Sequence, residues 1–194
     1  MKPTYVGFEA KQKSGFTQMP PPGAYLAKII GVKTEPSYDQ SREVIVLALE
    51  ITDGEYAGQY TKVYDEQKAS FGDGVKYRGT FRLTPFKDGD EPWVRSRFEG
   101  NLWAIQESNP GYAWDWDETR LRGLKVGINV RKCIYTGRDG SEKETTEIGQ
   151  LERICDVQDG KCRTLKERVQ KKTSSAVMDQ PKLTNVSQEV EVPF

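Results

Sequence analysis

Residues 42–52, REVIVLALEIT, form the clearest strand pattern in the chain and decide its fold class. Alternate side chains of a strand point to opposite faces of the sheet. Both sets are apolar here, with Ile45, Leu47, Leu49 and Ile51 on one face and Val44, Val46 and Ala48 on the other. The pattern therefore predicts a strand that is covered on both sides, as where a barrel wall meets an arm or a helix.

Further strand-like stretches lie on either side of this one, separated by turns that carry glycine or proline. They are residues 24–34, 59–65, 76–83, 124–134 and 143–157, and the hairpin turn between the last two is Gly137-Arg138-Asp139-Gly140. A helix is predicted over residues 94–107, where Phe98, Leu102 and Ile105 recur at helical spacing and Asn109-Pro110-Gly111 ends the pattern.

Short strands, Gly-rich turns and the lack of strand–helix–strand alternation favour an all-β barrel over a parallel sheet. A five-stranded Greek-key barrel with a helix between its third and fourth strands is the OB pattern. The chain fits this pattern with an extra strand near Lys76. We therefore expect a mainly β fold with one short helix, a five- or six-stranded OB-like Greek-key barrel over residues 23–160.

The two ends of the chain differ in composition from this domain. Residues 1–22 are expected to form an extended, flexible arm, because Met19-Pro20-Pro21-Pro22-Gly23 cannot continue a helix. This arm is a candidate for exchange between the subunits of a homo-oligomer. Residues 161–172 hold six basic residues against the single acid Glu167, which fits a short basic helix. Residues 173–194 are polar with scattered apolar residues, which is typical of a disordered tail.

The charge composition limits the classes of function. The 194 residues include 29 Lys or Arg, 29 Asp or Glu and no histidine. Zero net charge argues against nonspecific coating of duplex DNA, but it allows a basic groove balanced by acids elsewhere. The absence of histidine removes the usual general base and the usual metal ligand. Cys133, Cys155 and Cys162 lack C-x-x-C spacing, so neither a disulfide framework nor a zinc site is expected.

The sequence predicts a soluble, intracellular protein that has no membrane partner, cofactor or metal. No apolar run approaches the roughly 20 residues that span a bilayer, and residues 1–7 lack the apolar core of a signal peptide. The strongest enzymatic alternative is a metal-dependent nuclease built on Asp88, Asp90, Glu91, Asp115 and Asp117. Two-metal chemistry needs converging carboxylates, whereas these lie in separate Gly- and Pro-bearing loops. With no phosphate-binding glycine loop or activated nucleophile either, the chain is predicted not to be an enzyme.

The last six residues are Glu189-Val190-Glu191-Val192-Pro193-Phe194. An acidic, polar tail that closes on an apolar residue, Pro and Phe resembles the C-terminal tip of bacterial and phage single-stranded DNA-binding proteins. The resemblance implies that Val192, Pro193 and Phe194 dock on a basic, apolar pocket of replication or recombination proteins, while Glu189 and Glu191 add steering charge. Family tips are usually richer in Asp, which leaves the identity of the partner open.

Three strings of turn residues carry a second resemblance, which covers most of the predicted barrel. Gly23-Ala24-Tyr25, Ile51-Thr52-Asp53-Gly54-Glu55-Tyr56-Ala57-Gly58 and Asn109-Pro110-Gly111-Tyr112 look like those of a group of phage replication-module proteins. The two resemblances imply sequence-independent binding and protection of single-stranded DNA during phage DNA replication and recombination, in the cytoplasm of the infected bacterial cell. An OB-type adaptor that binds protein but no DNA is the alternative.

A surface for single-stranded DNA interleaves basic side chains, which track phosphates, with aromatic rings, which stack on bases. Three stretches have this pattern, and their candidate contacts are Tyr60, Lys62 and Tyr64; Lys76, Arg78 and Arg82; and Arg131, Lys132, Tyr135 and Arg138. Trp93, beside Arg95 and Arg97, is a further candidate. Trp103 is predicted to lie in the core, and Trp114 and Trp116 to pack or self-associate.

Overall fold

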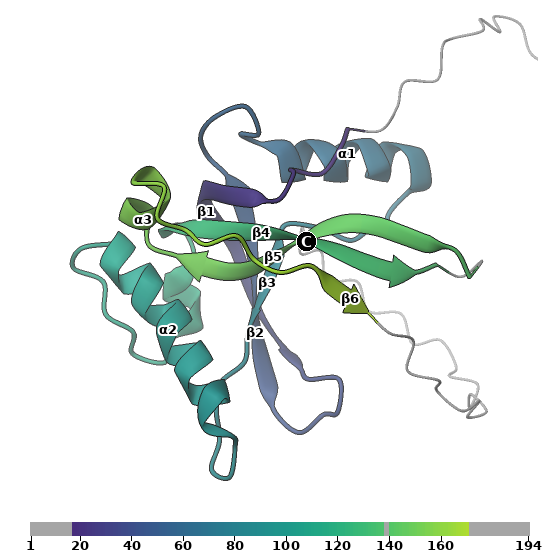
Figure 1. Cartoon of the computed structure of the whole chain (residues 1–194). Helices are drawn as coiled ribbons and strands as arrows, with labels where there is room; N and C mark the ends of the chain where they lie inside the picture. The colour runs from purple at the N-terminus through teal and green to yellow at the C-terminus, as the bar shows by residue number, and fades with distance from the viewer. Residues whose placement is uncertain (1–16, 138–139, 171–194) are drawn as a thin grey trace, which may run out of the picture.

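The computed structural model describes residues 17–137 and 140–170, which form six strands, three α-helices and one 3-10 helix (Figure 1). The elements in chain order are β1 Gly23–Pro36, β2 Glu43–Ile51, α1 Gln59–Phe71, β3 Thr80–Leu83, α2 Pro92–Ser108, η1 Glu118–Leu121, β4 Lys125–Thr136, β5 Glu142–Glu152, α3 Ile154–Gln158 and β6 Arg168–Gln170. The prediction of a mainly β chain is confirmed, whereas the prediction of a single short helix is wrong. In this part of the chain no helix is both long and apolar enough to cross a membrane.

The described strands form one sheet in the order β3-β2-β1-β4-β5, with β6 added beside β4. The long strand β1 joins the two halves. Its first half pairs with β4, from Gly23 opposite Val130, and its second half pairs with β2, up to Pro36 opposite Glu43. The β1–β2 register shifts between Ile29 and Gly31. Because such a bulge bends and twists a strand, β1 can belong to both halves of the sheet.

The sheet stays open and does not close into a barrel. Among the described strands β3 pairs with β2 alone, and it lies near β5 without a hydrogen-bonded ladder. It is also shorter than the predicted strand over residues 76–83, because it begins at Thr80. The Tyr77 hydroxyl shares one donated hydrogen bond between the Leu49 carbonyl and the Glu50 carboxylate, each at 3.0 Å. The Gly79 carbonyl accepts a hydrogen bond from the Leu49 amide at 2.7 Å. A Cβ at Gly79 would overlap the Leu49 carbonyl and lie 2.7 Å from the Tyr60 ring.

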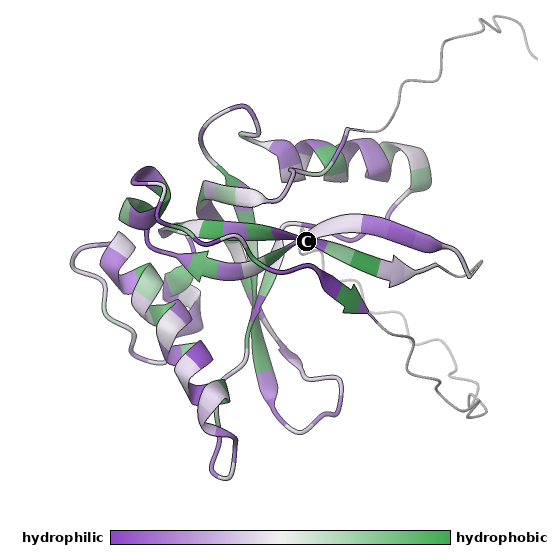
Figure 2. Ribbon diagram, in the orientation of Figure 1, coloured by the Kyte–Doolittle hydropathy of each residue, from purple (hydrophilic) through white to green (hydrophobic). Residues whose placement is uncertain are grey.

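The centre of the core comes from β2, as its sequence predicts. Every residue from Val44 to Leu49 is buried, which confirms that both faces of this strand are covered. The core includes Ala27 and Ile29 of β1, Ile45, Leu47, Leu49 and Ile51 of β2, Val126, Ile128 and Val130 of β4, and Phe98, Leu102 and Ile105 of α2. The predicted helix and its apolar face are thus confirmed. Figure 2 shows hydrophobic residues along the strands and hydrophilic residues over much of α1 and α2.

Residues 59–65, predicted to be a strand, form the first half of α1 instead. Tyr60 and Val63 are buried one turn apart on the helix. A short stretch with this pattern fits a strand as well as a helix. The Glu50 carboxylate of β2 accepts hydrogen bonds from the backbone N–H groups of Tyr60 at 3.1 Å and Thr61 at 2.6 Å. The helix start is therefore stabilised by a negative charge from another element, which the local sequence does not reveal.

The chain after β5 also differs from the prediction. The predicted strand over residues 143–157 ends at Glu152, and α3 follows it. Residues 161–167, predicted to begin a basic helix, have no regular structure, and β6 then pairs in parallel with β4. The Asn129 side chain holds this segment extended by donating to the Arg163 carbonyl at 2.8 Å. Leu165 packs over Gly149, where a Cβ would lie only 2.7 Å from it.

Candidate functional site

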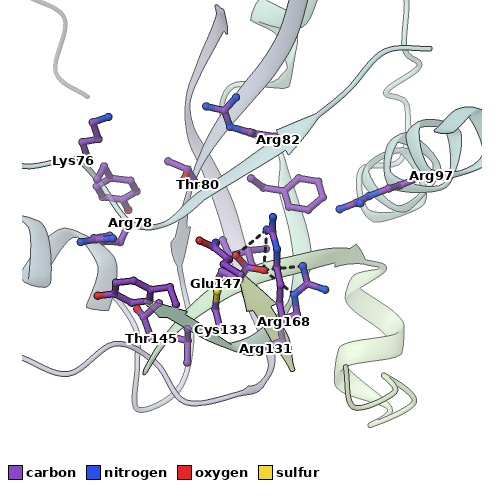
Figure 3. A pocket seen from close by; sticks show the side chains of 16 residues that line it. Lys76, Arg78, Thr80, Arg82, Arg97, Arg131, Cys133, Thr145, Glu147 and Arg168 are labelled. Atoms are coloured by element: carbon purple, nitrogen blue, oxygen red, sulfur yellow. Dashed lines mark hydrogen bonds and ion pairs between the residues drawn. The ribbon is translucent and has the colours of Figure 1, made fainter. Parts of the chain in front are cut away.

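A cleft of about 510 Å³ opens between β3 and β5, where the sheet is not paired. Its walls come from β3, α2, β4, β5 and β6, together with the residues that precede β3. The charged side chains that line it are Lys76, Arg78, Arg82, Arg97, Arg131 and Arg168, against the single acid Glu147 (Figure 3). The chain as a whole has equal numbers of basic and acidic residues. The cleft is therefore a local concentration of positive charge that attracts anions.

Glu147 joins two of the arginines in the cleft, as the dashed lines in Figure 3 show. Arg131 stands opposite Glu147 in the β4–β5 ladder and donates to its carboxylate through Nε at 2.8 Å and Nη2 at 2.7 Å. The guanidinium of Arg168, on β6, lies 3.3 Å from the same carboxylate. One carboxylate thus holds two guanidinium groups in place, and the cluster keeps a net positive charge.

The other basic residues of the cleft differ in how far they are neutralised. Arg82 forms an ion pair with Glu35 of β1. Lys76, Arg78 and Arg97 are exposed, and within the described residues none of them forms an ion pair with a carboxylate. Because these three charges form no ion pair in the part of the chain that the structure describes, they are the ones most available to an external anion.

Three further hollows share lining residues with the cleft. One of about 480 Å³ contains Trp93 and Arg42, one of about 790 Å³ is lined by residues 163–169, and one of about 530 Å³ contains Trp103 and Arg163. Arg97 of α2 lines the cleft and all three hollows. We call the cleft and these hollows together the basic channel. Arg97 stands where its parts meet.

Aromatic rings accompany the charges of the basic channel. Tyr135 is half-buried in the cleft and shares a face of β4 with Arg131. Trp93 near the start of α2 is 63% exposed, and Trp103 near its end is 51% exposed. The prediction that Trp103 lies in the core is therefore wrong. Leu102 occupies the buried face of α2. Trp103 follows it directly, and successive residues of a helix are turned by about 100°, so the Trp103 side chain points away from the core.

Most candidates from two of the three predicted stretches line the basic channel. Lys76, Arg78, Arg82, Arg131 and Tyr135 line the cleft itself, and Trp93 lines an adjoining hollow. The first stretch does not form the predicted strand face, because it is helical. Tyr60 is buried in the core, Lys62 is exposed on α1, and Tyr64 packs edge-on against Tyr77 with ring centroids 5.8 Å apart.

The remaining candidates lie elsewhere. Lys132 is on the opposite face of β4 from Arg131, and it pairs with Glu144 at 2.7 Å. Arg138 and the predicted docking residues Glu189, Glu191, Val192, Pro193 and Phe194 lie outside the described residues.

Six basic residues of the channel are not among the sequence-predicted contacts. They are Arg42, Arg97, Arg153, Arg163, Lys166 and Arg168. The helix predicted over residues 94–107 begins after Trp93. Because α2 begins at Pro92, Arg97 and Trp93 are one turn apart on the same face of the observed helix. Arg163, Lys166 and Arg168 belong to the stretch predicted as a basic helix, residues 161–172. Once this stretch is extended, Lys166 and Arg168 fall on one side, as alternate residues do.

Several acids and one thiol of the chain serve in ion pairs, a helix cap or the core, as the following contacts show. Asp90 is held by Arg42 through two contacts of 2.6 and 2.7 Å, and this hydrogen-bonded pair lowers the pKa of Asp90 to about 2. Asp115 pairs with Arg120, and Asp117 caps η1. Burial raises the pKa of the Cys133 thiol in the cleft. In the described ranges no three His, Cys, Asp or Glu side chains gather so that they could hold a metal ion.

Comparison with known proteins adds no assignment. A scan against protein-family models found no match, and neither did a search of curated protein sequences. The interpretation of the basic channel therefore rests on its own chemistry, which suits a flexible polyanion that carries planar groups.

Proposed function

We propose that this chain binds single-stranded DNA in the basic channel without sequence preference. The observation that carries the proposal is the concentration of arginine in the channel of a chain with no net charge. Arginine presents several donors to phosphate oxygens and remains charged at any physiological pH. Phosphate contacts fix the strand but carry no base information, so the binding has no sequence preference.

The aromatic residues favour a single strand over a duplex. Trp93, Trp103 and Tyr135 present exposed or half-buried rings along the channel. Unpaired bases can stack on such rings, whereas the bases of a duplex remain stacked on one another. A neutral chain also lacks the broad positive surface of proteins that coat duplex DNA.

An OB-like architecture is part of the proposal. An OB fold is a partly open, five-stranded Greek-key barrel that binds oligonucleotides on one face. The order β3-β2-β1-β4-β5, with α2 between β3 and β4, supports this interpretation. α1 is an addition between β2 and β3, and the channel lies at the gap between β3 and β5.

The biological role follows from the sequence resemblances. A protein of this kind protects single-stranded DNA during phage replication and recombination in the infected bacterial cell. Its C-terminal residues Val192, Pro193 and Phe194 recruit replication or repair proteins. A pull-down with the full chain and with a chain that ends at Thr173 tests the recruitment separately from DNA binding.

Fluorescence polarisation of labelled oligo-dT with the full chain tests the DNA binding. On single strands, the slope of log K against log salt is about −0.7 for each phosphate that is neutralised. A slope of about −2 is expected if only the three unpaired cations of the cleft act, and about −4 if all six act. An unlabelled duplex should compete poorly. No binding at low salt would overturn the proposal and favour the protein-binding adaptor.

A further inference from the structure

The hollow beside the middle of α2, lined by α2 residues between Ser96 and Ala104, combines an exposed indole with unpaired positive charge. It measures about 530 Å³ and lies between α2, β5 and residues 163–165. Trp103 lines it, and the guanidinium of Arg153 lies over the indole at 4.7 Å from the ring centroid. Asp156 holds this guanidinium through two hydrogen bonds of 2.7 and 2.8 Å. Arg153 therefore covers one face of the indole and holds it in position, while 51% of Trp103 remains exposed to solvent.

Gly100 provides a second and independent observation. It lies inside α2, one turn before Trp103, and lines the same hollow. Glycine is a poor helix former, so a glycine in the middle of a helix usually reflects close packing. Here a Cβ would have no atom within 4 Å, so no part of the described structure packs against this position. The bare backbone leaves open space beside the indole, which a flat group can occupy.

The charges around the hollow suit a phosphate next to that flat group. Arg97 lines the hollow, and the Arg163 guanidinium donates to the neutral side chain of Gln150 at 3.3 Å. Neither guanidinium forms an ion pair with a carboxylate among the described residues. The acids Glu152 and Asp156 also line the hollow, and Asp156 is paired with Arg153. Glu152 keeps its negative charge, but four arginines, Arg97, Arg131, Arg153 and Arg163, line the hollow against these two acids. An indole, a bare helix turn and two available guanidinium groups thus lie side by side.

We propose that this hollow is a base-stacking subsite, in which an unpaired base of the DNA stacks on Trp103 over Gly100 while Arg97 and Arg163 hold the adjacent phosphates. The inference rests on the proposed single-stranded DNA binding and deepens it. It places one end of the strand path on α2, outside the sheet.

The test measures the affinity of Trp103→Ala for oligo-dT and for an abasic oligonucleotide with the same number of phosphates. Stacking on one aromatic side chain contributes enough that its removal should raise the Kd for oligo-dT by about 5- to 150-fold. The Kd for the abasic strand should change less than about twofold, because only its phosphates remain. Trp116→Ala is the matched control, because Trp116 is 62% exposed and lines none of the four parts of the channel.

Gly100→Gln tests the same subsite without removing any contact of the folded protein. This side chain favours a helix and meets open space, so it should raise Tm by about 2–4 °C. It should nevertheless weaken oligo-dT binding several-fold. The inference is overturned if the wild type binds oligo-dT and both variants match it, or if Trp103→Ala weakens binding to both oligonucleotides equally. If the wild type binds neither strand at low salt, the proposed function itself fails, and the subsite with it.

Discussion

Arg97→Ala is the substitution that most sharply separates the basic channel from the rest of the surface. Arg97 lines all four parts of the channel and has no ion-pair partner among the described residues, so its loss removes positive charge without freeing a carboxylate. One lost phosphate contact should make the salt slope shallower by about 0.7. The affinity for oligo-dT at low salt should fall by about 1 kcal/mol, or roughly fivefold.

Arg95→Ala is the matched control for this prediction. Arg95 is on the same helix two residues away, but it pairs with Glu99 at 2.7 Å and lies over the Phe86 ring at 5.0 Å. Its removal should leave the salt slope of the wild type unchanged. Polarisation titrations of both variants at four or more salt concentrations give the two slopes. Equal slopes for Arg97→Ala and the wild type would refute the reasoning, as would an equal effect of the two substitutions.

Three further predictions follow from other parts of the molecule. Arg78→Glu should weaken oligo-dT binding by about tenfold at low salt, because Arg78 lines the cleft. Lys62→Glu, on α1 outside the cleft, should change the affinity by less than about twofold. Equal losses of affinity for the two variants would contradict the location of the site. Gly79→Ala should lower the free energy of unfolding, measured in urea, by about 1–3 kcal/mol, because the new methyl group overlaps a backbone carbonyl. The pKa of Asp90 is lowered by Arg42 to about 2, so its contribution to stability is present above about pH 4 and is lost as the pH falls towards 2. Urea unfolding at about pH 5 and about pH 2.5 should therefore show a smaller loss for Arg42→Ala than for the wild type, and equal losses would count against this pair.

The elements that the sequence predicts well are those whose own residues determine their burial. Every residue from Val44 to Leu49 is apolar, and no pairing partner is needed to expect a strand buried on both faces. The helix that carries Phe98, Leu102 and Ile105 is equally clear, because three apolar residues at helical spacing precede Asn109-Pro110-Gly111. In both cases the local pattern and the tertiary environment agree.

The elements that the sequence does not predict depend on contacts with distant residues. Residues 59–65 become helical next to Glu50, whose carboxylate accepts hydrogen bonds from the first turn of α1. Residues 161–167 stay extended because Asn129 binds the Arg163 carbonyl and Gly149 leaves room for Leu165. A single sequence does not show which side chains the fold brings to these segments.

In the candidate site, too, the local sequence pattern predicts some residues, while others depend on contacts between distant segments. The basic-aromatic pattern identifies Lys76, Arg78, Arg82, Arg131 and Tyr135, because their strands and loops lie at the edges of the cleft. Alternation alone does not identify Arg168, since the pairing of β6 with β4 is parallel and joins segments far apart in the chain. Nor does it reveal that one carboxylate, Glu147, holds two of the arginines.

Photo-crosslinking of the full chain to an oligo-dT that carries 4-thiothymine, followed by mass spectrometry of the adducts, tests the central claim most directly. If single-stranded DNA lies in the basic channel, the adducts should map to α2, to β4 and β5 near Tyr135, and to residues 163–170. Excess unlabelled oligo-dT should abolish them. Adducts confined to α1 or to the acidic residues 112–118, with none in the channel, would contradict the account.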